Sequence, residues 1–150
     1  MIPLRAAPAA VARPVVIDPA ARRFLLLPAG SARAAGWTVP ALPVRDQEPY
    51  RRTVLRHLRR ERGFPAVRIG AVVGRLPAGA ARPVEEYVVL AAPACGRWPR
   101  DVRALMAPGA RWWDTAALRR SGDAVEPETL PLFLDGYWEG WLPDGVISLE

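Results

Sequence analysis

Apolar residues gather in short runs along most of the chain, and this pattern predicts strands. Runs rich in β-branched and bulky apolar residues predict four of them, at 15–18, 23–27, 66–76 and 84–93. Pro19 opens the turn expected between the first two strands. Residues 36–42 are expected to be extended as well, because Pro40 and Pro43 disfavour helix on either side. Strand signals are therefore present in both halves of the chain.

One segment shows the helical period instead. Tyr50, Val54 and Leu58 recur at every fourth residue, which predicts a helix with one face against a core. Asp46 is its expected N-cap. Gly63 is its expected C-terminal cap, because glycine readily adopts the left-handed conformation that ends helices.

Two later segments complete the predicted elements. Residues 110–120 are typical of a strand end that passes into a short helix, and residues 127–142 of a final amphipathic helix. Strands interleaved with helices in this order predict an α+β fold, a sandwich of sheet and helices. A chain of 150 residues fits one such domain.

Composition places the chain among globular proteins, with 51% apolar and 24% charged residues. Its longest apolar runs, such as 24–27 and 88–92, fall far short of the roughly 20 residues that span a bilayer, so no membrane partner is expected. The N-terminus has an arginine inside its apolar part, unlike a signal peptide. Cys95 is the single cysteine, which excludes an internal disulfide and fits a reducing compartment. We therefore expect a cytoplasmic protein.

Charge is concentrated on the predicted helix. All 21 basic residues are arginine and the net charge is +6. Between residues 48 and 62, six arginines stand against two glutamates; the arginines are Arg51, Arg52, Arg56, Arg59, Arg60 and Arg62. Two interpretations remain open, a solvated helix face and an anion-binding surface. Nucleic acid is not an expected partner, because no motif that reads DNA or RNA accompanies the charge.

The same segment carries a recognisable motif. The Nudix box has the pattern G-x5-E-x7-R-E-U-x-E-E-x-G-U, where U is a bulky aliphatic residue. In this sequence its nine defined positions hold Leu42, Glu48, Arg56, His57, Leu58, Arg60, Glu61, Gly63 and Phe64. Five of them match outright, and Phe64 is a bulky apolar equivalent. The stretch 42–64 thus resembles a degenerate Nudix box.

The flanking segments extend the resemblance. "GWTVPAL" (36–42) is similar to the W-x-x-P-G-G segment of the family, and "RWWDTAALR" (111–119) to its late RWW-x-x-x-E-L segment. The chain is thereby identified as a suspected member of the Nudix hydrolase superfamily. This resemblance implies the Nudix fold, a mixed β-sheet flanked by helices in an α/β/α sandwich. It also implies one domain over 11–150, preceded by a tail at 1–10.

The resemblance further implies a site on the box helix. In Nudix enzymes, carboxylates at the positions of residues 57, 60 and 61 hold Mg²⁺ or Mn²⁺ against a substrate diphosphate. Here these positions hold His57, Arg60 and Glu61, whose charges sum to about zero. Two unit charges 4 Å apart interact by about 4 kcal/mol at an effective dielectric of 20, so a guanidinium among the ligands opposes a divalent cation. We expect the metal site to be lost and no cofactor to be needed.

The resulting hypothesis is a Nudix-fold protein that binds rather than hydrolyses. Its ligand would be a nucleotide, another phosphorylated metabolite or a protein partner. Arg56 and Arg60 are the expected phosphate-binding residues, because guanidinium forks match phosphate oxygens. Glu85 and Glu86 complete the expected ligand site, because alternation along a strand turns one of them toward the cleft.

The alternative is a metal-dependent hydrolase of a nucleoside-diphosphate-linked substrate. Glu48 and Glu61 would then be the catalytic and metal-binding carboxylates, with a third recruited from Glu85 or Glu86. A homodimer is also an open expectation. Trp138 and Trp141, three residues apart on the last predicted helix, either cover the sheet or form a contact between subunits.

Overall fold

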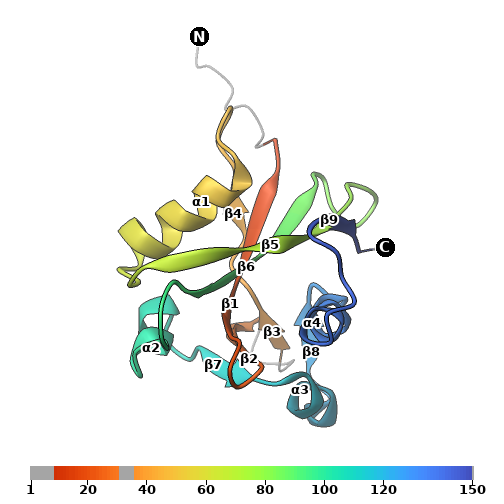
Figure 1. Cartoon of the computed structure of the whole chain (residues 1–150). Helices are drawn as coiled ribbons and strands as arrows, with labels where there is room; N and C mark the ends of the chain where they lie inside the picture. Colours follow the sequence, from red (N-terminus) through yellow and green to blue (C-terminus); the bar gives the residue numbers. More distant parts are fainter. Residues whose placement is uncertain (1–8, 31–35, 150) are drawn as a thin grey trace.

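Nine strands and four helical segments form a layered α+β structure in the computed structural model, which describes residues 9–30 and 36–149 (Figure 1). The strands are β1 Val11–Asp18, β2 Arg23–Ala29, β3 Gly36–Thr38, β4 Leu42–Pro43, β5 Val67–Leu76, β6 Glu86–Pro93, β7 Arg111–Trp113, β8 Ala124–Glu126 and β9 Gly145–Ser148. The helices are α1 Tyr50–Arg56 with its π-helical continuation η1 His57–Glu61, α2 Val102–Met106, α3 Thr115–Ser121 and α4 Leu130–Trp138. The expected mixed sheet with flanking helices is confirmed.

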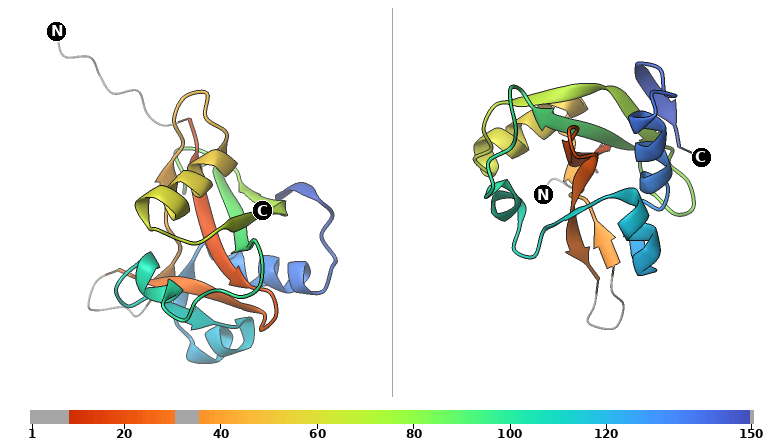
Figure 2. Two further views of the ribbon diagram at one scale, coloured as in Figure 1. Left: turned by 60° about the vertical axis from the view of Figure 1, so that its left-hand side comes forward. Right: turned by 60° about the horizontal axis from the view of Figure 1, so that its bottom comes forward.

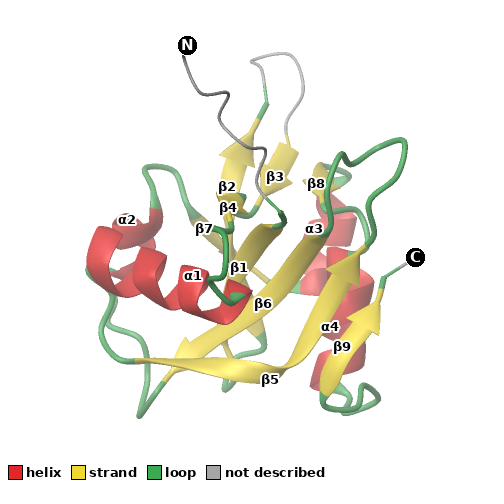
Figure 3. Cartoon of the chain, turned by 90° about the horizontal axis from the view of Figure 1, so that it is seen from above, coloured by secondary structure: helices red, strands yellow, loops and turns green. Residues whose placement is uncertain are grey.

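β1 is the centre of the sheet. The strand order is β8-β3-β2-β1-β6-β5-β9, with β4 paired to β1 and β7 paired to β2. β6 runs parallel to β1 over 11–16, whereas β4 and β2 pair antiparallel with its two ends. Figure 3 shows β5 and β6 running antiparallel beneath α1, with the end of β5 beside β9. The fold thereby places the box helix over the strands at the centre of the sheet.

Helices cover both faces of the sheet, so β1 is buried on both. Val15 and Ile17 contribute to a core beneath α3 and α4, and Ala12 and Val16 to a second core beneath α1 and α2. The views in Figures 1 and 2 place α1 and α2 on one side of the sheet and α3 and α4 on the other. Burial on both faces explains why the strand segments read as continuous apolar runs rather than alternating ones.

Most predicted elements are present, with two corrections at helix ends. The N-cap prediction is wrong, because α1 starts at Tyr50 after an extended Pro49, while Asp46 lies in a turn. The final helix is shorter than expected, because Gly140 adopts a left-handed φ of 74° just after it. No helix in the described part of the chain is long and apolar enough to cross a membrane.

Candidate functional site

The box helix widens halfway along its length. The Arg62 N–H donates to the carbonyl of His57, five residues back, at 3.0 Å, and the Phe64 N–H donates to Leu58 at 2.8 Å. Gly63, with a φ of +72°, turns the chain between them, as its cap role predicts. Wider turns of this kind occur often at functional sites.

Four box residues form one chain of contacts along this helix. Arg56 donates to both oxygens of Glu48, which also accepts a hydrogen bond from Thr53 Oγ1 at 2.7 Å. The Thr53 hydroxyl and then Arg56 lower the pKa of Glu48. The structure thus brings together the box glutamate and arginine, and joins the loop before the helix to its last α-helical turn.

Glu61 extends the chain at the other end. Its Oε2 lies 2.8 Å from His57 Nδ1, and its Oε1 lies 3.8 Å from Arg56 Nε. The hydrogen bond from His57 is the main cause that lowers the pKa of Glu61, with Arg56 adding to it. An ionised carboxylate only accepts, so the Nδ1 of His57 carries the proton. His57 itself is buried, and its Nε2 has no hydrogen-bond partner among the described residues.

A basic groove of about 630 Å³ lies along the outer face of α1 and η1. Its lining combines the helix with the preceding loop and the start of β5; the residues are Arg45, Glu48, Arg52, Leu55, Arg56, Arg59, Arg60, Ala66 and Val67. Five arginines against one glutamate leave the groove with four net positive charges. We call this surface the basic groove.

Three arginines of the basic groove are available to a ligand. Arg56 is held by Glu48, and Arg59 donates to the carbonyl of Phe64 at 3.0 Å. The side chains of Arg45, Arg52 and Arg60 are exposed and make neither a hydrogen bond nor an ion pair within residues 9–30 and 36–149. Sequence reasoning identified Arg56 and Arg60 but not Arg45, because nothing in the helical pattern shows that the preceding loop folds back against it.

Glu85 and Glu86 do not line the basic groove. Glu85 pairs with Arg75 and accepts a hydrogen bond from Tyr87 at 2.7 Å, and these contacts, Arg75 first, lower its pKa. Tyr87 in turn stacks on Tyr50 at the start of α1, with ring centroids 4.4 Å apart. Glu85 therefore supports the start of α1 through Tyr87 and Tyr50 and does not face the basic groove.

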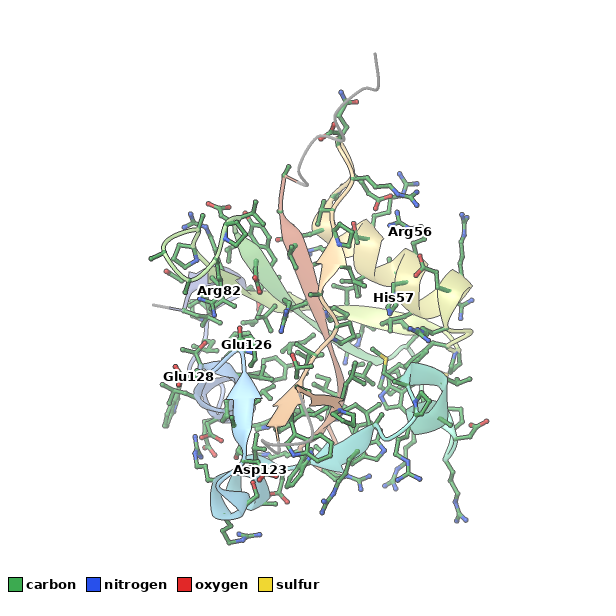
Figure 4. The ribbon with its side chains drawn as sticks, turned by 180° about the vertical axis from the view of Figure 1, so that it is seen from behind. Arg56, His57, Arg82, Asp123, Glu126 and Glu128 are labelled. Carbon is green, nitrogen blue, oxygen red and sulfur yellow. The ribbon has the colours of Figure 1, made fainter. Side chains whose placement is uncertain are left out.

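Glu86 belongs to a second charged cluster on the opposite face of the sheet. It lies 3.7 Å from Arg13 Nε on β1 and 3.9 Å from Arg82 Nε. Arg13 is buried and also donates to Thr38 Oγ1 at 3.0 Å, and burial lowers its pKa. Figure 4 shows Arg56 and His57 on one side of the molecule and Arg82 and Glu126 on the other. Sequence reasoning missed this cluster, since Arg13 sits in an apolar run.

Solved structures with this architecture identify the fold. A UDP-X diphosphatase superposes with a TM-score of 0.60 at 11% identity, covering 97% of this chain and 70% of that one. A NUDIX hydrolase from Nitrosomonas europaea gives 0.57 at 14% identity, covering 97% and 81%. The C-terminal domain of mouse MUTYH, solved in complex with human PCNA, gives 0.53 at 20% identity, covering 91% and 93%.

The chain has the Nudix fold. No family model matches the sequence, and no curated protein matches it either. The Nudix likeness therefore lies in the arrangement of strands and helices, together with the box residues Glu48, Arg56, Leu58, Glu61 and Gly63. A shared fold does not by itself define the chemistry, which depends on the residues of the site.

The residues at the Nudix metal positions do not fit a magnesium site. Mg²⁺ requires oxygen ligands in near-octahedral geometry. Here a ring nitrogen of His57 faces Glu61. The remaining metal position holds Arg60, whose side chain lines the basic groove. Within the described parts of the chain, no three His, Cys, Asp or Glu side chains are grouped so that they could hold a metal ion. Of the carboxylates that remain, Glu48 is paired with Arg56, and Glu61 contacts His57 and lies near Arg56.

Proposed function

We propose that this Nudix-fold protein binds a phosphorylated ligand directly on the arginines of the basic groove and does not hydrolyse it. The observation that carries the proposal is the placement of Arg45, Arg52 and Arg60 around one groove, since these three guanidinium groups have no partner within the described residues. Guanidinium groups bind phosphate through paired, charge-assisted hydrogen bonds. In this role they replace the metal ions that neutralise diphosphate in Nudix enzymes.

The size and lining of the groove suit a nucleotide or a phosphorylated metabolite. A volume of about 630 Å³ lies within the roughly 300–1,000 Å³ typical of small-molecule sites. Leu55, Ala66 and Val67 supply the apolar part of the lining beside the arginines. A ligand with phosphates at one end and an apolar or planar part at the other would use both surfaces.

Glu48 has a positioning role in this proposal. It holds Arg56 in place and leaves the flanking Arg52 and Arg60, one helical turn away on either side, to meet the phosphates. The pair of Glu48 and Arg56 thus keeps the loop and helix in register, and the unpaired arginines supply the affinity.

Paired double variants on the same helix test the proposal. Arg52→Gln with Arg60→Gln removes two groove charges, whereas Arg51→Gln with Arg62→Gln removes two charges outside the groove lining. Glutamine keeps almost the same helix propensity as arginine, so the comparison isolates charge. Binding of inorganic pyrophosphate and of ADP is measured by calorimetry in EDTA.

The two double variants should differ sharply. A hydrogen bond to a charged group contributes about 1.5–3 kcal/mol, so the groove variant should lose at least about tenfold in affinity for both anions. The control variant should bind within about twofold of the parent protein. Equal losses in the two variants, or no binding of either anion by the parent, would refute direct anion binding in the groove.

Metal-dependent hydrolysis is the second candidate, since two proteins of similar structure are named as a diphosphatase and a hydrolase. It requires Glu48 to leave Arg56 and Glu61 to leave His57, and then to share one ion. Pyrophosphate or nucleoside-diphosphate cleavage that depends on Mg²⁺ and disappears in Glu61→Gln would favour this function over the first.

A further inference from the structure

Exposed apolar side chains are concentrated in one groove on the far side of the sheet from the basic groove. Three large apolar side chains are strongly exposed in the described part of the chain, and two of them, Leu132 at 69% and Trp141 at 73%, line this groove. The third, Val146, lies on β9. The groove has a volume of about 640 Å³ and runs between α4, the start of α3 and the turn before β2. We call it the tryptophan groove.

The backbone holds Trp141 in place without burying its ring. The Trp141 N–H donates to the carbonyl of Gly136 at 2.9 Å, and the Gly140 N–H donates to Tyr137 at 3.1 Å. With Gly140 in the left-handed conformation, these two bonds form a Schellman motif. The residue at the Trp141 position usually packs on the helix, but here Leu142 contacts the Gly136 site instead. Trp141 is therefore presented to the solvent in a defined position.

The tryptophan groove is acidic although the chain is basic. Three carboxylates line it, from Asp114, Asp135 and Glu139, and Arg22 is the cation of its lining. Asp135 is paired with Arg119 beside the groove at 2.7 Å, and Asp114 accepts from the Ala117 N–H at 2.7 Å as the cap of α3. The Arg22–Glu139 ion pair is exposed on both sides, and exposed pairs contribute little. Glu139 thus remains available to an incoming cation, and the lining of the groove is acidic although the protein as a whole carries a net charge of +6.

We propose that the tryptophan groove docks a basic peptide segment that carries an aromatic or aliphatic residue next to arginine or lysine. The apolar residue of the partner covers Leu132 and Trp141, and its cation meets Glu139 or stacks on the Trp141 ring. Contiguous exposed apolar groups with a polar rim are typical of protein contact sites. This docking uses no residue of the basic groove, so its test does not depend on whether the protein binds phosphate.

Fluorescence polarisation with three labelled twelve-residue peptides tests the docking. One alternates arginine with leucine and tryptophan, the second has glutamate in place of each arginine, and the third keeps the arginines but has serine at the apolar positions. Only the first should bind the parent protein, and its affinity should fall with added salt. Equal binding of the first two peptides, or binding of none, would overturn the proposal.

Surface variants locate the bound peptide. Trp141→Ala should weaken binding at least tenfold, because buried tryptophan contacts dominate many interfaces, and Glu139→Gln should weaken it about threefold at low salt. Val146→Ser is the matched control, since it removes the third exposed apolar side chain, on β9, and should change nothing. Equal effects of Trp141→Ala and Val146→Ser would refute the placement. A concentration-dependent dimer that Trp141→Ala abolishes in sedimentation equilibrium would assign the groove to a second copy and overturn the peptide proposal.

Discussion

Removing the groove arginines should make this protein more stable while it loses its ligand. Arg52 and Arg60 each lie four residues from Arg56 on the same helix, so three guanidinium groups follow one another along the basic groove. Arg45 and Arg59 add further positive charge beside them. This arrangement does not favour folding, because like charges one turn apart repel each other.

The expected gain follows from this spacing. A like-charge pair at i,i+4 destabilises a helix by about 0.2–0.5 kcal/mol. Arg52→Gln with Arg60→Gln removes two such pairs, which corresponds to at most about 0.4–1 kcal/mol at low ionic strength, because the Glu48 carboxylate compensates part of the Arg56 charge. For a domain of this size, 1 kcal/mol shifts the melting temperature by roughly 2–4 °C. The double variant should therefore melt at a higher temperature than the parent, by up to about 4 °C.

Differential scanning calorimetry at 10 mM and 1 M NaCl measures this effect. The gain should vanish at 1 M NaCl, where the screening length is about 3 Å. Arg51→Gln with Arg62→Gln is the control for lost charge outside the groove, and it should change the melting temperature less. A lower melting temperature for the groove variant at both salt concentrations would refute the reasoning, because it would give Arg52 and Arg60 a structural role.

The remaining predictions concern the box helix. Leu58→Ala empties a fully buried position in the core beneath α1 and should lower the free energy of unfolding by about 2–5 kcal/mol in urea titrations. A loss below about 1 kcal/mol would show that Leu58 does not belong to this core. Gly63→Ala meets open space but a φ of +72°, so backbone strain alone should cost about 1–2 kcal/mol in the same titrations, and no loss would contradict the left-handed cap. The lowered pKa of Glu61 means that its contribution is present above its ordinary pKa of about 4.3 and is lost as the pH falls through the lower folded value. Melting temperatures between pH 2.5 and 6 should thus fall less steeply in Glu61→Gln than in the parent, and identical profiles would contradict the contact with His57.

The helix and its C-terminal cap could be predicted from the sequence because their signals are local. Tyr50, Val54 and Leu58 mark the buried face by spacing alone, and Gly63 marks the end. β8 and β9 could not be predicted in the same way. Each is three or four residues long and pairs in parallel with a strand far away in the chain, so its stability comes from the partner strand and not from its own pattern.

Only part of the candidate site could be predicted from the sequence, because the rest also depends on segments that meet only in the folded chain. Arg56 and Arg60 stand out within the box, but Arg45 joins them only once the loop has folded back on the helix. The burial of His57 depends on the wide turn that follows it, which no residue spacing indicates. The alternation of side chains along a strand predicts that Glu85 and Glu86 point to opposite faces of the sheet. It does not predict their partners, Arg75 and Arg13, because these arginines lie on other strands.

Magnesium titration of pyrophosphate binding is the most direct test of the claim that arginines, and not metal ions, bind the phosphates in this groove. Affinity would be measured by calorimetry in EDTA and at rising Mg²⁺ concentrations, with phosphate release followed in the same samples. We predict that Mg²⁺ weakens binding, because it neutralises the anion that the arginines recognise, and that no phosphate is released. Tighter binding with added Mg²⁺, accompanied by steady phosphate release, would contradict the account.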